Sequence, residues 1–158
     1  MIRLSLLLTM IGQPALALSC LPYGVQDSWV DASAAAERYV VVSGEFSLTS
    51  TTPPRPAPEV REPSIIVPQT QTYHARFEGK AWANGSFSRA ITGQANITVN
   101  CIAQWCGNLP KGPWVAFLRE DDNGGYETET GPCGGRIYAD TPNVRGAIRS
   151  CASGGACQ

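Results

Sequence analysis

Apolar and polar residues alternate along several segments of this chain, a pattern that is typical of β-strands. Between residues 40 and 48 the even positions are apolar or glycine, and the two-residue period returns in residues 72–83 and 95–101. Residues 114–118 are apolar without alternation, as in a strand that is covered on both faces. Gly44 falls on the apolar face of the first segment, where a glycine often marks a bend at the corner of a barrel.

Turn signals separate these segments. Asn84-Gly85 is the strongest hairpin signal in the chain, because both residues readily adopt the positive φ angles of a two-residue turn. The chain then returns through Phe87, and we expect the returning strand to break near Gly93. Residues 120–125 (EDDNGG) predict a further turn, which leads into the strand pattern YETET.

Two short helices are expected beside the strands. The Ala-rich residues 31–37 favour a helix with Asp31 as its N-cap. Thr141-Pro142 predicts the start of a second helix, with a hydroxyl at the N-cap and proline at the first helical position. Helical spacing predicts an inner face made of Val144, Ala147, Ile148 and Cys151.

Together these elements predict a mainly β fold, namely a small, closed or nearly closed β-barrel of five to six strands with one or two flanking helices. An immunoglobulin-like sandwich is the alternative, but it needs more strands and a Cys…Trp…Cys spacing that the chain does not have. Six of the 12 prolines lie between residues 53 and 68. We expect residues 51–68 to form an extended surface loop, because proline cannot donate a hydrogen bond to a strand ladder.

Residues 1–17 have the composition of a cleaved signal peptide, in which a basic residue precedes a short apolar run and a small-x-small pattern ends at Ala17. Cleavage after Ala17 leaves residues 18–158 as a single exported domain, in the periplasm or outside the cell. Cleavage after Ser19 is the alternative. Acylation of Cys20, as in a lipoprotein, ranks below simple secretion, because Ala17 stands where lipoprotein signals favour a larger aliphatic residue.

Charge and hydropathy narrow the choice of partners. Once Arg3 is removed with the signal, 11 basic and 13 acidic residues remain and no basic stripe is left, which argues against nucleic acid as a partner. No later segment is long and apolar enough to span a membrane. We expect the partner to be an unknown protein or a component of the cell envelope.

The six cysteines are expected to form three disulfides, because an even count in an exported chain is typical of a disulfide framework. Trp105-Cys106-Gly107 begins like a thioredoxin-type redox site, but that site needs a second cysteine where this chain has Leu109. We therefore expect Cys106 to be structural, with the nearby Cys101 as its partner. From sequence alone, 15 connectivities are open to Cys20, Cys101, Cys106, Cys133, Cys151 and Cys157.

Candidates for catalysis or metal binding are few. His74 is the only histidine, and it falls on the polar face of a strand between charged neighbours, where a solvated side chain is expected. Glu120, Asp121 and Asp122 do not follow the order of a calcium-binding EF-hand loop. We therefore assign no catalytic residue, no metal ligand and no cofactor. An envelope enzyme with an unrecognised site is the alternative.

Four segments carry a resemblance to a known family: SCLP (19–22), ASAAAERYVVVSGEF (32–46), CGNLPKGPWVAFL (106–118) and YETETGPCGG (126–135). Their order resembles the netrin-like domains of tissue inhibitors of metalloproteinases and of their bacterial secreted relatives. Those relatives begin with a Cys-Ser-Cys-x-Pro type motif, followed by a short Ala-rich helix and a strand that ends in glycine. The resemblance touches most of the chain after the signal and implies an OB-type barrel.

The resemblance also implies disulfide pairs. It matches Cys20 to a family cysteine whose partner corresponds to Cys133. This pairing leaves Cys151 and Cys157 to bridge the last helix to its own tail.

One departure from the family pattern affects both pairing and function. Leu18 stands where the family has its first cysteine, so Cys106 lacks its family partner, and Cys101 is an added cysteine close to it. In the inhibitors, the amine and carbonyl of that first cysteine chelate the zinc of the protease. We therefore expect a non-enzymatic binding domain, and rank a metalloprotease inhibitor below it.

Overall fold

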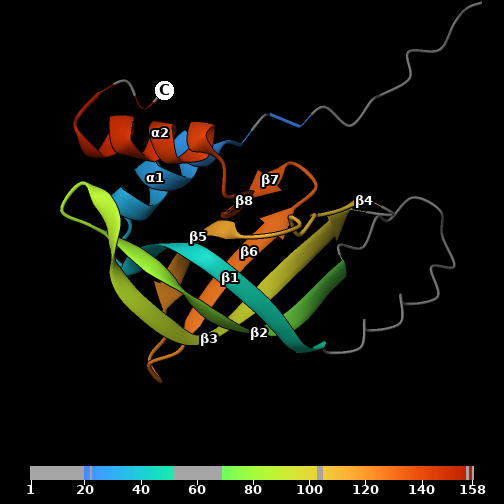
Figure 1. Ribbon diagram of the computed structural model, residues 1–158. Coiled ribbons are helices and arrows are strands. Elements are labelled where there is room, and N and C mark those ends of the chain that lie inside the picture. Colours follow the sequence, from blue (N-terminus) through green and yellow to red (C-terminus); the bar gives the residue numbers. More distant parts are fainter. Residues whose placement is uncertain (1–19, 22, 52–68, 103–104, 156, 158) are drawn as a thin grey trace, which may run out of the picture.

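Figure 1 shows the computed structural model of the chain, in which residues 20–21, 23–51, 69–102, 105–155 and 157 are described. The expected signal segment 1–17 and residues 52–68 of the expected Pro-rich loop lie outside the described residues. In chain order the elements are α1 (Val25–Ala34), β1 (Tyr39–Thr51), β2 (Gln69–Ala83), β3 (Ser86–Ile102), β4 (Trp105–Cys106), β5 (Trp114–Glu120), β6 (Tyr126–Gly131), β7 (Gly134–Gly135), β8 (Ile137–Ala139) and α2 (Pro142–Ala152).

The described strands form one mostly antiparallel sheet that curls into a partly closed barrel, which confirms the predicted fold class. Their order is β4-β3-β2-β1-β5-β6-β7, and β8 pairs with β5. Parallel pairing of β6 with β3 joins the two sides of the sheet, from Ala95 opposite Tyr126 to Val99 opposite Thr130. In the described part of the chain five strands are long, whereas β4, β7 and β8 are extensions of two or three residues.

The bend expected at Gly44 lies in β1, which Figure 1 shows as a strongly curved strand. Gly44 lies directly opposite Gly79 of β2. A methyl group on Gly44 would lie 2.3 Å from the carbonyl oxygen of Glu78, and one on Gly79 would lie 2.3 Å from the carbonyl oxygen of Ser43. The two facing glycines therefore allow the two backbones to approach closely.

The β2–β3 hairpin turns at Asn84 and Gly85, whose φ angles of 51° and 80° confirm the predicted turn. The predicted break near Gly93 is wrong, because β3 is continuous from Ser86 to Ile102. A Cβ atom on Gly93 would lie 2.9 Å from the ring of Phe77 on β2. The glycine therefore makes room for this ring and does not interrupt the strand.

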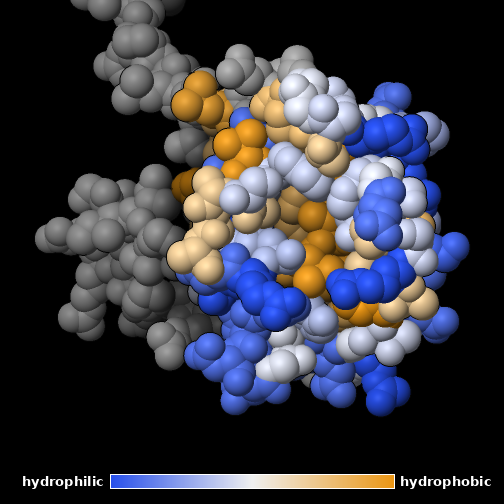
Figure 2. All heavy atoms as spheres, turned by 90° about the vertical axis from the view of Figure 1, so that its left-hand side faces the viewer, coloured by the Kyte–Doolittle hydropathy of each residue, from blue (hydrophilic) through white to orange (hydrophobic). Residues whose placement is uncertain are grey.

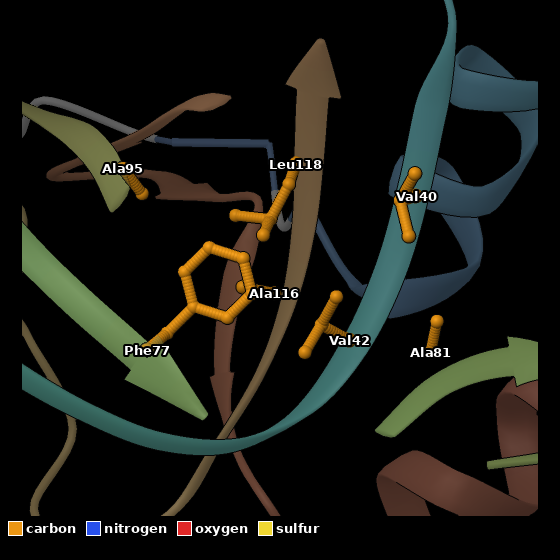
Figure 3. Close-up of a cluster of buried hydrophobic side chains, with 7 residues drawn as sticks. All are labelled: Val40, Val42, Phe77, Ala81, Ala95, Ala116 and Leu118. Atoms are coloured by element: carbon orange, nitrogen blue, oxygen red, sulfur yellow. The ribbon is translucent and has the colours of Figure 1, made fainter. Parts of the chain in front are cut away.

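The side chains that alternate along the sequence fill the barrel. Figure 3 shows one interior cluster, in which side chains from β1, β2, β3 and β5 point toward one another. Phe46 links this cluster to the next one, because its ring stacks on Phe77 at 5.2 Å and on Trp114 at 4.9 Å between centroids. Leu48, expected on the same buried face, is 46 % exposed and lies near the end of β1, directly before the register shift between Leu48 and Ser50.

Helix α1 begins earlier than the sequence pattern suggests. The predicted helix at residues 31–37 with Asp31 as N-cap is wrong in both respects, since α1 spans Val25–Ala34. Asp27 is the acidic residue at its start, where the carboxylate accepts the backbone N–H of Gly24 at 2.6 Å. Asp31 lies within the helix and accepts the hydroxyl of Tyr23 at 2.5 Å.

Helices α1 and α2 lie side by side over the outer face of β5 (Figure 1). Val115 and Phe117 of β5 are fully buried there, against Val25 of α1 and Ile148 of α2. All of residues 114–118 are buried, which confirms the prediction of a strand covered on both faces. Among the described helices, none combines the length and the apolar character required to cross a membrane.

Buried hydroxyl groups attach α1 to the barrel. The fully buried Ser28 places its Oγ 2.7 Å from the hydroxyl of Tyr138 and 3.2 Å from the carbonyl oxygen of Gly135. Tyr138 donates to the carbonyl oxygen of Gly24 at 2.8 Å. Burial raises the pKa of Tyr138 to about 12, so its hydroxyl keeps its proton and remains a donor at neutral pH.

An ion pair attaches α2 to β1. The helix begins at the predicted N-cap, Thr141, and the adjacent Asp140 accepts hydrogen bonds from Arg145 at 2.5 and 2.6 Å. Ser43 of β1 donates to the same carboxylate at 2.6 Å and accepts from Arg145 at 2.9 Å. The hydrogen bonds from Arg145 hold the pKa of Asp140 below its ordinary value.

We expect the variant Asp140→Asn to lose about 2 kcal/mol of unfolding free energy at pH 7, because it removes charge-assisted hydrogen bonds from a side chain that is only 4 % exposed. A lowered carboxyl pKa stabilises the fold above the pKa of the unfolded chain, about 4, and this contribution is lost as the pH falls through the folded value. Urea unfolding from pH 7 to pH 2.5 should therefore show the wild type and Asp140→Asn converging below about pH 4.

Asp122→Asn, in the exposed β5–β6 turn, is the matched control and should keep the wild-type stability at both ends of the range. A constant difference between Asp140→Asn and the wild type at every pH would show that the charge of Asp140 does not stabilise the fold.

Candidate functional site

The residues considered for catalysis and metal binding are scattered in the fold. His74 is exposed on β2, where its Nδ1 lies 2.7 Å from Oδ1 of Asn96. Asp121 accepts the backbone N–H groups of Asn123 and Gly125 at 2.8 and 2.7 Å, so it shapes the β5–β6 turn. Over the described residues, no three His, Cys, Asp or Glu side chains gather in a group that could hold a metal ion.

Cys106, which the sequence places in a motif that begins like a redox site, is part of a disulfide. Its sulfur is bonded to that of Cys101, and the pair lies where β4 pairs with the end of β3. Trp105 precedes the bridge and pairs with Ile102, yet it is 54 % exposed. A short disulfide-closed hairpin therefore presents a large aromatic side chain to solvent.

A second bridge presents a second apolar side chain. Cys20 is bonded to Cys133, and the backbone N–H of Tyr23 donates to the carbonyl oxygen of Cys133 at 3.4 Å. Between them, Leu21 is 88 % exposed. A lipoprotein anchor would occupy the sulfur of Cys20 with a thioether, so the disulfide and such an anchor exclude each other. The third bridge joins Cys151 of α2 to Cys157, and all three are the pairs that the sequence analysis expected.

The first two bridges lie at the same end of the barrel. Gly107 donates its backbone N–H to the carbonyl oxygen of Asn100 at 2.9 Å, and a Cβ atom on it would lie 2.7 Å from the backbone nitrogen of Gly131. Gly131 is the last residue of β6, directly before the β6–β7 turn that contains Cys133. We call this surface the disulfide end; it consists of residues 20–21, 105–107 and 131–135.

A cavity of about 620 Å³ opens at the disulfide end, lined by Leu21, by the Cys20–Cys133 bridge and by neighbouring polar residues. Charges of both signs line it, since Arg136 faces Asp31 at 4.0 Å and Glu129 accepts from Asn100 at 3.4 Å. The guanidinium of Arg136 also lies 4.8 Å from the centre of the Tyr39 ring. Apolar and polar groups are thus available to a partner within one hollow.

Tyr23 lines the same cavity, and its hydroxyl donates to Asp31. Burial raises its pKa, and its hydrogen bond to Asp31 acts in the same direction. This hydroxyl is therefore protonated at neutral pH and serves as a donor to Asp31, and it does not act as a base.

Sequence reasoning considered Trp105 only as part of a redox motif and did not single out Leu21. An apolar residue directly beside a cysteine, outside the long alternating segments, is the signal that could have identified both. Comparison with protein-family models, with curated proteins and with solved structures found no match for this chain.

Proposed function

We propose that this chain is an exported, non-enzymatic binding module that docks onto another protein through its disulfide end. Three disulfides are typical of proteins that fold in an oxidising compartment, which supports a periplasmic or extracellular location. The netrin-like resemblance supports a protein as the partner. Inhibition of a metalloprotease is the narrower form of this function that the resemblance suggests.

One observation carries the proposal: each of two disulfides at one end of the barrel holds a large apolar side chain exposed next to it. Leu21 is 88 % and Trp105 is 54 % exposed. Tryptophan is among the residues that most often dominate binding energy at interfaces. Because the bridges fix the local backbone, a partner that covers these side chains would lose little conformational entropy of the module on binding.

The test is a pull-down from envelope extract with the tagged chain after signal removal, repeated with the double variant Leu21→Ser/Trp105→Ser. We expect the wild type to retain a defined protein that the variant loses. Binding of that purified protein should weaken by a factor of about 30 or more in titration calorimetry, since a tryptophan hot spot contributes about 2 kcal/mol or more.

Val30→Ser is the matched control, because Val30 is also an apolar side chain, 47 % exposed, but lies on α1. It should retain the partner at wild-type affinity. All variants must unfold near the wild-type temperature for the comparison to hold, as expected for exposed positions. Undiminished binding by the double variant would contradict docking at this end, and turnover in a hydrolase substrate panel would favour the enzyme alternative.

A further inference from the structure

A second hollow lies away from the disulfide end, where α1 meets the start of β1 and the tip of the β2–β3 hairpin. It has a volume of about 310 Å³, and we call it the aromatic pocket; its walls include Trp29, Val40, Trp82 and Phe117. In Figure 1 the hairpin tip and β4 lie on opposite sides of the molecule. Figure 2 views the hairpin side and shows a hollow with a hydrophobic floor between hydrophilic side chains.

Aromatic rings hold the walls of this pocket in place. Trp29 of α1 meets Trp82 of β2 edge to face at 6.2 Å between centroids, and meets Phe117 of β5 in the same manner at 6.5 Å. Trp82 in turn packs on Phe87, across the hairpin, at 5.1 Å. Such contacts between rings favour a pocket that is formed before a ligand arrives.

The charged residues that line the pocket are all positive. Its lining contains Arg38 and Arg89 and no aspartate or glutamate among the described residues. Arg38 is engaged by Glu120, with its Nε 3.3 Å from the carboxylate. Arg89 is exposed and forms no ion pair within the described part of the chain. In a chain whose acidic residues outnumber its basic ones, this local cationic rim is distinctive.

We propose that the aromatic pocket binds a small amphipathic carboxylate, with the apolar part against Trp29 and Trp82 and the carboxylate at Arg89. Most residues that line the pocket are apolar or aromatic, as is usual in small-molecule sites, and 310 Å³ is at the small end of the range for such sites. A guanidinium binds a carboxylate through two parallel hydrogen bonds. The acid is either a medium-chain aliphatic acid or a bicyclic aromatic acid.

Octanoate is the probe for the aliphatic acid, and 2-naphthoate is the probe for the aromatic acid. Octanol is the uncharged control for octanoate. The indole N–H signals in ¹⁵N NMR provide an internal control, because Trp29 and Trp82 line the pocket whereas Trp105 and Trp114 do not. We expect the signals of Trp29 and Trp82 to shift in a saturable manner. The probe that binds more tightly shows which of the two classes of acid the pocket prefers.

Arg89→Gln should weaken binding of the acid about threefold to fivefold and leave octanol binding unchanged, because it removes an exposed charge and keeps a polar side chain. Arg76→Gln is the matched control, since Arg76 is an exposed arginine of β2 outside this pocket. The variant Leu21→Ser/Trp105→Ser should bind the acid as tightly as the wild type, because neither residue lines the aromatic pocket. A negative result for docking at the disulfide end would therefore not count against this pocket. Equal shifts of all four indole signals, no saturation by 10 mM, or equal losses in Arg76→Gln and Arg89→Gln would each overturn the proposal.

Discussion

Replacing Cys20 and Cys133 together with serine should lower the free energy of unfolding by about 5 kcal/mol and stop the chain from accumulating in folded form. The bridge joins residues 113 positions apart, and in the chain-entropy model a closed loop of that length restricts the unfolded chain strongly. A loss of this size equals or exceeds the whole stability of many small domains. Urea unfolding of the purified double variant, or its yield where it cannot be purified, measures the effect.

Cys101→Ser/Cys106→Ser is the matched control, because it removes a bridge from the same end of the barrel. This bridge spans only five positions, so the same model assigns it about 2 kcal/mol, and the variant should fold. If the two double variants lose equal stability, loop closure does not explain how the long bridge stabilises the barrel.

Replacing Gly44 with alanine should cost about 3 kcal/mol or more, although alanine is the smallest possible addition. Its Cβ atom would lie 2.3 Å from the Glu78 carbonyl oxygen and 2.6 Å from the Cα of Gly79, and both contacts are with backbone. These close contacts can be removed only if β1 and β2 move apart, which disturbs the hydrogen bonds between the two strands on both sides of the bend. Thermal and urea unfolding should both show the loss.

Gly146→Ala is a control in which the same substitution should raise the free energy of unfolding. Gly146 lies within α2, is exposed, and has nothing within 4 Å of the position of a new Cβ atom. Alanine should therefore stabilise the chain by about 0.5–1 kcal/mol through helix propensity. A Gly44→Ala variant as stable as the wild type would show that the strands at the bend are farther apart than the structure has them.

The strands of the barrel could be predicted from sequence because their inner faces are buried and their outer faces are solvated. This difference imposes the two-residue period that places Ala95, Ile97 and Val99 inside. The expected helix start failed because the Ala-rich segment has high helix propensity, whereas the actual start depends on a local contact between Asp27 and the backbone of Gly24. Propensity is the weaker of the two signals at a helix end.

The candidate sites could not be predicted in the same way, because their residues do not recur at a fixed spacing along the sequence. Leu21 lies outside the helices and strands and Trp105 lies in a two-residue strand, and the exposure of both depends on how the disulfides fold the backbone. The aromatic pocket brings together Trp29, Trp82 and Phe117 from three elements that are far apart in the sequence. Only the folded barrel places them side by side.

The long bridge also sets a constraint on how the chain is made. In chain order Cys20 is followed by Cys101 and Cys106, and only then by its partner Cys133. An oxidant that joined each cysteine to the next as it emerged would couple Cys20 to Cys101. Cys20 must therefore either remain reduced until more than a hundred further residues have appeared, or be released from a wrong partner by thiol–disulfide exchange. Early closure of the short Cys101–Cys106 ring removes both competitors at once, so the least stabilising bridge can determine whether the most stabilising one forms correctly.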